Sequence, residues 1–90
     1  MMAKLQIIVN IKVESKLLDK VTDSLKKYPE VIDLYEVTGE FDVVAVINTD
    51  NMVEFRKFLK DKLLKIEGVE TTHTAVVLYT HKRGGKLVEG

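Results

Sequence analysis

Apolar residues recur in two rhythms along this chain, every second position in some stretches and every third or fourth in others. The stretch LQIIVNIKV (5–13) alternates largely apolar with polar positions, which is typical of a β-strand. Three further strands are predicted at 31–38 (VIDLYEVT), 41–49 (FDVVAVINT) and 70–80 (ETTHTAVVLYT). The gap between the second and third strands is short and contains Gly39. We therefore expect a hairpin in which glycine adopts a backbone angle that other residues avoid.

The first helical stretch lies between the first two strands. Its apolar residues are spaced three or four positions apart and predict one buried stripe: Leu18, Val21, Leu25 and Tyr28. Ser15 has a side chain that caps helix starts, and Pro29 is expected to stop the helix.

The second helical stretch follows the third predicted strand. Asn51 and Glu54 have the spacing of a capping box, and Gly68 is a suitable cap for the C-terminal end. The inner face of this helix is predicted to carry Met52, Phe55, Leu59, Leu63 and Ile66.

The elements follow one another in the order β-α-β-β-α-β, and the second half of the chain nearly repeats the first, with Leu25 matching Leu63. Two βαβ halves of this length predict an α+β fold, the ferredoxin-like βαββαβ sandwich, in which a four-stranded antiparallel sheet carries both helices on one face. We place this domain at residues 1–81. Residues 82–90 (KRGGKLVEG) show no periodicity and are predicted to form a C-terminal tail.

The predicted sheet has more apolar surface than two helices can cover. A sheet with one solvated face normally alternates apolar and polar residues, yet residues 43–47 (VVAVI) and 75–78 (AVVL) are apolar throughout, and Ile8 lies on the polar side of the first strand. A large uncovered apolar face is rare on a soluble monomer, so we expect a partner, most simply a second copy of the chain. The alternative is that the tail folds back over this face, although the tail is short, basic and contains three glycines.

Composition and charge narrow the range of functions. The chain has 90 residues, and its 14 Lys and Arg residues balance 14 Asp and Glu residues, which argues against nucleic-acid binding through bulk charge. It has no cysteine, so disulfides and thiolate metal sites are excluded. The apolar runs are too short to span a bilayer and the N-terminus lacks the features of a signal peptide. We therefore expect a cytoplasmic protein with no membrane contact.

No pattern of catalytic or metal-binding residues stands out. His73 and His81 are eight positions apart, more than the usual spacing of a ligand pair, and His73 is better explained as a strand residue with a local partner. RNA-binding domains of this topology stack bases on strand aromatics, but basic residues do not cluster with Tyr35 or Phe41. We expect no enzyme activity, no metal and no cofactor.

Two groups of residues together match the chemistry of a free amino acid. The turn at Gly39 is rich in backbone N–H groups, which can hold a carboxylate, and Asp42 can hold an ammonium group. Thr72 and Thr74 are two positions apart on a strand, so their hydroxyls point to one face and can serve either group. Taken singly, the first group is a hairpin turn and the second is a set of strand formers; taken together, they indicate an amino-acid site.

Over about residues 5–80 the chain resembles the effector domain of the Lrp/AsnC (feast/famine) transcriptional regulators. This domain is also called RAM, for regulation of amino acid metabolism. The resemblance rests on the motif VTGEFD, followed in order by an apolar strand, a helix and the motif GVETTHTAVVL. The resemblance implies a dimer of the dimeric alpha-beta barrel type, with sheets packed face to face, that assembles into an octamer or decamer. Amino acids would bind where dimers meet. The implied ligand-binding residues are Gly39, Phe41, Asp42, Met52, Thr72, Thr74 and Val76. The family motif often has tyrosine after the aspartate, whereas this chain has Val43, so the identity of the amino acid stays open.

The resemblance also implies a role in transcriptional regulation of amino acid metabolism. Full regulators carry a helix-turn-helix domain ahead of this one, but the first strand begins at about residue 5. We therefore expect a stand-alone RAM domain that binds no DNA itself, and that acts alone or joins full-length Lrp/AsnC regulators. The alternatives are a small dimeric ferredoxin-like monooxygenase, which would need a heme-ligating histidine or a base, an ACT domain, whose usual glycine is missing from KVESK, and a ligand-free assembly module.

Overall fold

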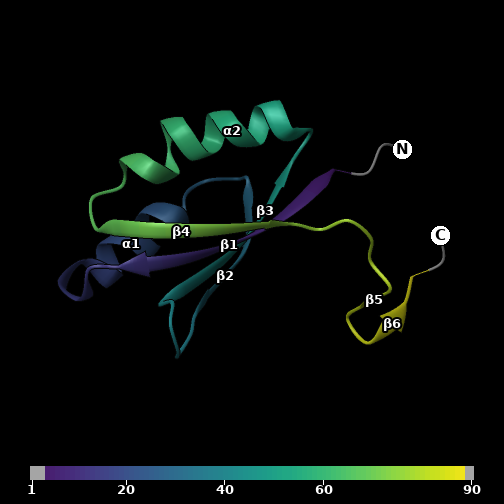
Figure 1. The fold of residues 1–90 in the computed structure, drawn as a ribbon, viewed down its shortest axis with the longest axis horizontal. Coiled ribbons are helices and arrows are strands. Elements are labelled where there is room, and N and C mark those ends of the chain that lie inside the picture. Colours follow the sequence, from purple (N-terminus) through teal and green to yellow (C-terminus); the bar gives the residue numbers. More distant parts are fainter. Residues whose placement is uncertain (1–3, 89–90) are drawn as a thin grey trace.

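A computed structural model describes residues 4–88 as one antiparallel sheet of four strands with both α-helices on one face (Figure 1). The main elements in chain order are β1 (Leu5–Val13), α1 (Leu18–Leu25), β2 (Val31–Glu36), β3 (Val43–Thr49), α2 (Met52–Asp61) and β4 (Val69–Val76). Short 3-10 turns precede α1 at Ser15–Leu17 and follow α2 at Leu63–Lys65. The predicted ferredoxin-like βαββαβ fold is confirmed.

The strands lie in the order β2-β3-β1-β4, so the two central strands come from different halves of the chain. Val9 of β1 lies opposite Ala45 of β3 on one side and Thr74 of β4 on the other. Residues that face each other in an antiparallel ladder point to the same side of the sheet, so this register assigns each side chain to one face. We call the face without helices the open face; it carries Ile8, Asn10, Lys12, Val44, Val46, His73 and Ala75.

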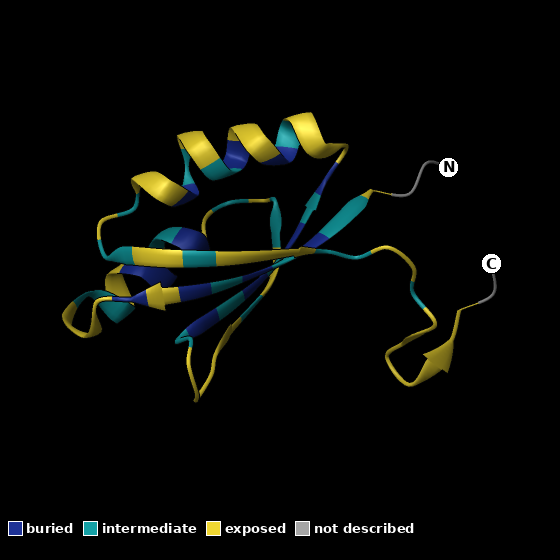
Figure 2. Ribbon diagram, in the orientation of Figure 1, coloured by how far each residue is buried: buried dark blue, intermediate teal, exposed yellow. Residues whose placement is uncertain are grey.

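The hydrophobic core lies between the sheet and the helices (Figure 2). Alternate residues of the two central strands are completely buried there: Ile7, Val9, Ile11, Val43, Ala45 and Ile47. The prediction for the inner face of α2 is partly wrong. Met52 is 50% exposed, because it is the first residue of the helix and lies at the margin of the core. Phe58, which was not predicted, is 3% exposed and packs edge-on against the ring of Tyr28, with 5.6 Å between the ring centroids.

The two helices begin in different ways. Asn51 caps α2 as predicted, since its side-chain oxygen accepts a hydrogen bond from the Glu54 N–H at 2.9 Å. The expectation that Ser15 caps the first helix is wrong. Ser15 begins a 3-10 turn instead, and the preceding Glu14 N–H donates to the carbonyl of Gly68 at 2.8 Å, so a contact between distant segments sets this helix start.

Three of the four strands of the sheet differ from their predicted ranges. β2 ends at Glu36 and β3 begins at Val43, so a longer turn joins them, and Gly39 at its tip has a φ of 114°. β4 ends at Val76 rather than at residue 80. The tail also differs from the prediction of an irregular segment, because Lys82–Arg83 (β5) and Lys86–Leu87 (β6) pair as a small hairpin that extends away from the sheet (Figure 1). The domain boundary between residues 81 and 82 stays a prediction.

Gly68 brings the end of α2 against the start of α1. Its φ is 106°, and a Cβ atom added there would lie 2.7 Å from the Cβ of Leu17. Gly39 has a similar φ of 114° but open space around it. We expect Gly68→Ala to lower the free energy of unfolding by about 1–3 kcal/mol more than Gly39→Ala does, because only the first substitution adds a steric overlap to the backbone strain. Urea denaturation of both variants at one chain concentration measures the difference, and equal losses would contradict the close packing at Gly68.

Candidate functional site

Asp42 ties the β2–β3 hairpin to the end of β1. Its carboxylate oxygen Oδ2 accepts a hydrogen bond from the Val13 N–H at 2.8 Å, and its own N–H donates to the carbonyl of Ile11 at 3.0 Å. Its carbonyl accepts from the Val37 N–H at 2.9 Å, which closes the turn. The conformation of this region therefore depends on Asp42 as well as on Gly39. Within the described part of the chain the second carboxylate oxygen, Oδ1, has no hydrogen-bond partner, so it is the part of Asp42 that can receive a ligand.

Phe41 lies on the open face of the sheet. Its ring contacts the imidazole of His73, with 4.9 Å between the ring centroids and 54° between the ring planes. His73 faces Asn10 in the ladder, and both belong to the open face. The interpretation of His73 as a strand residue with a local partner is thus supported, and that partner is Phe41.

Three other predicted site residues point to the opposite side of the sheet. All three are ladder partners of β1 residues whose side chains are buried beneath the helices. The pairs are Thr72 with Ile11, Thr74 with Val9, and Val76 with Ile7. The two threonine hydroxyls do share one face, as predicted. That face is the one the helices cover, at the edge strand β4, and Thr74 remains exposed there.

A single copy of the chain therefore does not assemble the seven predicted residues into one pocket. Phe41 is on the open face and the threonines are on the helix-covered face. Met52 follows the end of β3, whereas the hairpin precedes its start. None of the seven lines any of the four best-formed surface hollows described among residues 4–88. The ligand site stays a prediction, and in one copy of the chain its predicted residues lie on separate surfaces.

The open face is apolar along its centre. Ile8 lies between Val46 on β3 and Ala75 on β4, and Val44 follows two positions from Val46. A hollow of about 620 Å³ extends over this part of the sheet. Its lining has five polar or charged residues and four apolar ones, which are Ile8, Ile32, Val46 and Val77. The tail hairpin reaches only its edge, where the Arg83 guanidinium donates to Gln6 Oε1 at 2.8 Å. Beyond that contact the hairpin extends away from the sheet, so the described residues of the tail, 82–88, do not cover the face (Figure 1).

Sequence reasoning missed the link between Asp42 and Val13. The two residues are 29 positions apart, and no local pattern signals a hydrogen bond from a backbone N–H to a distant carboxylate. It also missed two exposed leucines beyond β4: Leu78 is 94% exposed, and Leu87 in the tail is 79% exposed. In the part of the chain that the structure describes, no helix has the length and apolar character needed to cross a membrane.

The family model of the Lrp/AsnC ligand binding domain matches residues 6–87. The HTH-type transcriptional regulator FL11 of Pyrococcus furiosus is 46% identical over 77 residues, which are 86% of this chain and 50% of that protein. The chain thus spans about half the length of the curated relatives it matches first. These relatives are HTH-type transcriptional regulators.

Two solved structures share the fold. The complex of the transcriptional regulator NMB0573 with L-Met, from Neisseria meningitidis, has a TM-score of 0.85 at 27% identity and is matched over 93% of this chain and 56% of that one. TTHA0845 from Thermus thermophilus has a TM-score of 0.82 at 25% identity, and the match covers 88% of this chain and 99% of that one.

Replacing Asp42 separates its role in the fold from its charge. We expect Asp42→Ala to lower the free energy of unfolding by about 1–3 kcal/mol, because the Val13 N–H then loses its acceptor in a partly buried position. Asp42→Asn keeps an oxygen at this place and should lose less than about 1 kcal/mol. Urea denaturation checks both values, and an Asp42→Ala variant as stable as the wild type would show that the hydrogen bond contributes nothing.

Proposed function

The chain belongs to the Lrp/AsnC family through its ligand-binding domain, and from this premise we propose that residues 4–88 bind a free amino acid and assemble with further copies of the same chain. The bound L-Met in the Neisseria regulator supports an amino acid as the class of ligand. The observation that carries the proposal is the hydrogen bonding of Asp42. Its Oδ2 atom accepts from the Val13 N–H, while its Oδ1 atom has no partner among residues 4–88.

The hairpin supplies groups for both ends of an amino acid. The free oxygen of Asp42 accepts the ammonium group, and backbone N–H groups at the exposed turn around Gly39 donate to the carboxylate. Since Val13 and Ile11 hold Asp42 in place, little order has to be gained when the ligand binds. The rest of the proposed lining consists of Phe41, Met52, Thr72, Thr74 and Val76. They lie on different faces of one chain, so the site is proposed to form between copies.

The open face is the feature that supports association between copies of the chain. Its centre carries an apolar patch, which residues 82–88 leave uncovered. Burying apolar surface contributes roughly 25 cal/mol per Å² before the costs of association. We propose a homodimer with the two open faces in contact. Further assembly into an octamer or decamer, contact with full-length Lrp/AsnC regulators, and a stand-alone mode of action stay predictions.

The proposed role is regulatory. The relatives are transcriptional regulators, so the domain would report the level of an amino acid by changing its own assembly or that of its partners. No DNA contact is proposed for the described domain, because its charges are balanced.

Amino-acid binding should depend on the charge of Asp42. We expect calorimetry with the twenty amino acids to find at least one ligand of the wild type, and Asp42→Asn to weaken its binding by about ten-fold or more, since losing one charged hydrogen bond removes about 1.5–3 kcal/mol. Glu40→Gln is the matched control, because Glu40 is an exposed acid of the same turn with no described contact. A wild type that binds none of the twenty, or an Asp42→Asn variant that binds as well, would rule out the hairpin site.

Assembly should depend on the apolar centre of the open face. Val46→Lys places a charge there, and we expect it to shift the protein to monomers at micromolar concentration because an unpaired charge is costly to bury. The matched control is Val53→Lys, because Val53 is 65% exposed on α2, away from the open face. Sedimentation velocity should show a monomeric Val46→Lys variant and an assembled Val53→Lys variant. An assembled and folded Val46→Lys variant would place the interface elsewhere.

A further inference from the structure

The end of the described chain forms an arm that projects from the sheet (Figure 1). We use this name for residues 78–88, which follow the end of β4 and contain the β5–β6 hairpin. Gly84 and Gly85 at its tip have φ values of 58° and 79°, and positive angles at both positions are what a tight two-residue hairpin loop requires. The Val88 N–H closes the hairpin by donating to the carbonyl of His81 at 3.0 Å.

The arm carries large apolar side chains that are exposed. Leu78 is 94% exposed, Leu87 is 79% exposed and Tyr79 is 58% exposed. Each strand of the hairpin has only two residues, and so small a hairpin is at most marginally stable in water unless it packs against another surface. The exposed side chains therefore indicate that the arm contacts another molecule.

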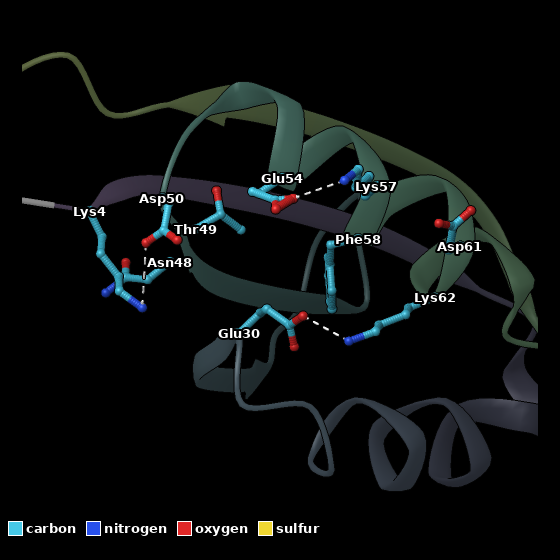
Figure 3. Close-up of a pocket in the computed structure, with 10 residues that line it drawn as sticks. All are labelled: Lys4, Glu30, Asn48, Thr49, Asp50, Glu54, Lys57, Phe58, Asp61 and Lys62. Atoms are coloured by element: carbon cyan, nitrogen blue, oxygen red, sulfur yellow. Dashed lines mark hydrogen bonds and ion pairs between the residues drawn. The ribbon is translucent and has the colours of Figure 1, made fainter.

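The hollow on the open face contains an acid and a base that are not paired within one chain. Three charged residues line it: Lys4, Asp33 and Arg83. Lys4 forms an ion pair with Asp50, which Figure 3 shows together with two other ion pairs near α2. Asp33 and Arg83 form no ion pair among residues 4–88, although they line the same hollow.

Asp33 and Arg83 lie toward opposite edges of the open face. Asp33 belongs to the edge strand β2 and faces Val46 of β3, so its side chain is on the open face. The Arg83 guanidinium donates to Gln6 Oε1 at 2.8 Å and to Thr80 Oγ1 at 3.3 Å, and both acceptors are neutral. A guanidinium has five N–H donors, so Arg83 keeps donors for a carboxylate.

We propose that the arm of one copy packs against β2 of a second copy, with Arg83 in an ion pair with Asp33 of the partner subunit. In a two-fold dimer each subunit presents the same acid and the same base, so the pair forms twice. Both segments also carry exposed apolar residues, Leu87 on the arm and Ile32 and Tyr35 on β2. The contact therefore joins opposite charges and apolar surface in one place.

This inference rests on the proposed dimer of open faces and names a second part of its interface. The contact with Gln6 places Arg83 at the margin of the open face, so the arm continues the surface that the second copy is proposed to cover. The apolar centre of the face and the arm are separate in sequence, and the two parts of the interface can be changed independently.

The first test is sedimentation velocity of the full chain and of charge-reversal variants. We expect Arg83→Glu and Asp33→Arg each to raise the dissociation constant of the dimer about ten-fold or more, because each reversal replaces two attractions by two repulsions. The double variant restores opposite charges and should return to within about three-fold of the wild type. Lys60→Glu is the matched control, because Lys60 is exposed on α2 and forms no ion pair among the described residues.

Cross-linking tests the contact itself. The chain has no cysteine, so Arg83→Cys and Asp33→Cys chains can be mixed and treated with a short bismaleimide. We expect a cross-linked dimer of the two chains, and much less product when Lys60→Cys replaces Asp33→Cys.

These experiments separate the arm contact from the dimer on which it rests. If the wild type is dimeric but the single reversals do not weaken it, the double variant does not recover, or no cross-link forms, the arm contact is wrong and the open-face dimer stands. If the wild type is monomeric at micromolar concentration, both are wrong.

Discussion

The fold depends on one constraint: a four-stranded sheet has two faces, and two helices cover only one of them. Ile7, Val9 and Ile11 of β1 are completely buried beneath the helices, and the residues between them point to the open face. On β3 these intervening residues are Val44 and Val46, so the strand is apolar on both sides. The first set of side chains accounts for the stability of a single chain. The second set is not covered by other parts of the same chain among the described residues. We therefore propose that a second copy covers it in a dimer.

Asp42 connects this sheet to the proposed ligand site. Its Oδ2 atom holds the hairpin against Val13 at the end of β1, and its Oδ1 atom is left for a ligand. One side chain thus stabilises the turn and presents a negative charge at the margin of the open face, next to Phe41 and His73. If two open faces pack together, these groups lie at the rim of the interface. Binding of an amino acid there would then change the free energy of assembly, which is the physical basis for a regulatory response.

The sequence was sufficient to predict the fold, because alternation and helical spacing are direct consequences of burying one face of each element. The range of β1 was predicted as 5–13 and is Leu5–Val13. The starts of the helices were harder to predict. Asn51 caps its helix through a local contact. Ser15 does not cap the first helix, because the preceding Glu14 donates its N–H to the carbonyl of the distant Gly68. The placement of the candidate site residues could not be predicted either. The segment 75–78, at and beyond the end of β4, is apolar throughout. Only the register with β1 therefore shows that Thr72 and Thr74 point toward the helices.

The central claim is that a second copy of the chain covers the open face, and the accessibility of a thiol on that face tests it most directly. The chain has no cysteine, so Ala75→Cys on the open face and Val53→Cys on the outside of α2 each introduce a single thiol. Both positions are exposed in one copy of the chain. The account predicts that at micromolar concentration the thiol of Ala75→Cys reacts much more slowly with a thiol reagent than that of Val53→Cys, and that dilution removes the difference. Equal reaction rates at all concentrations would contradict it.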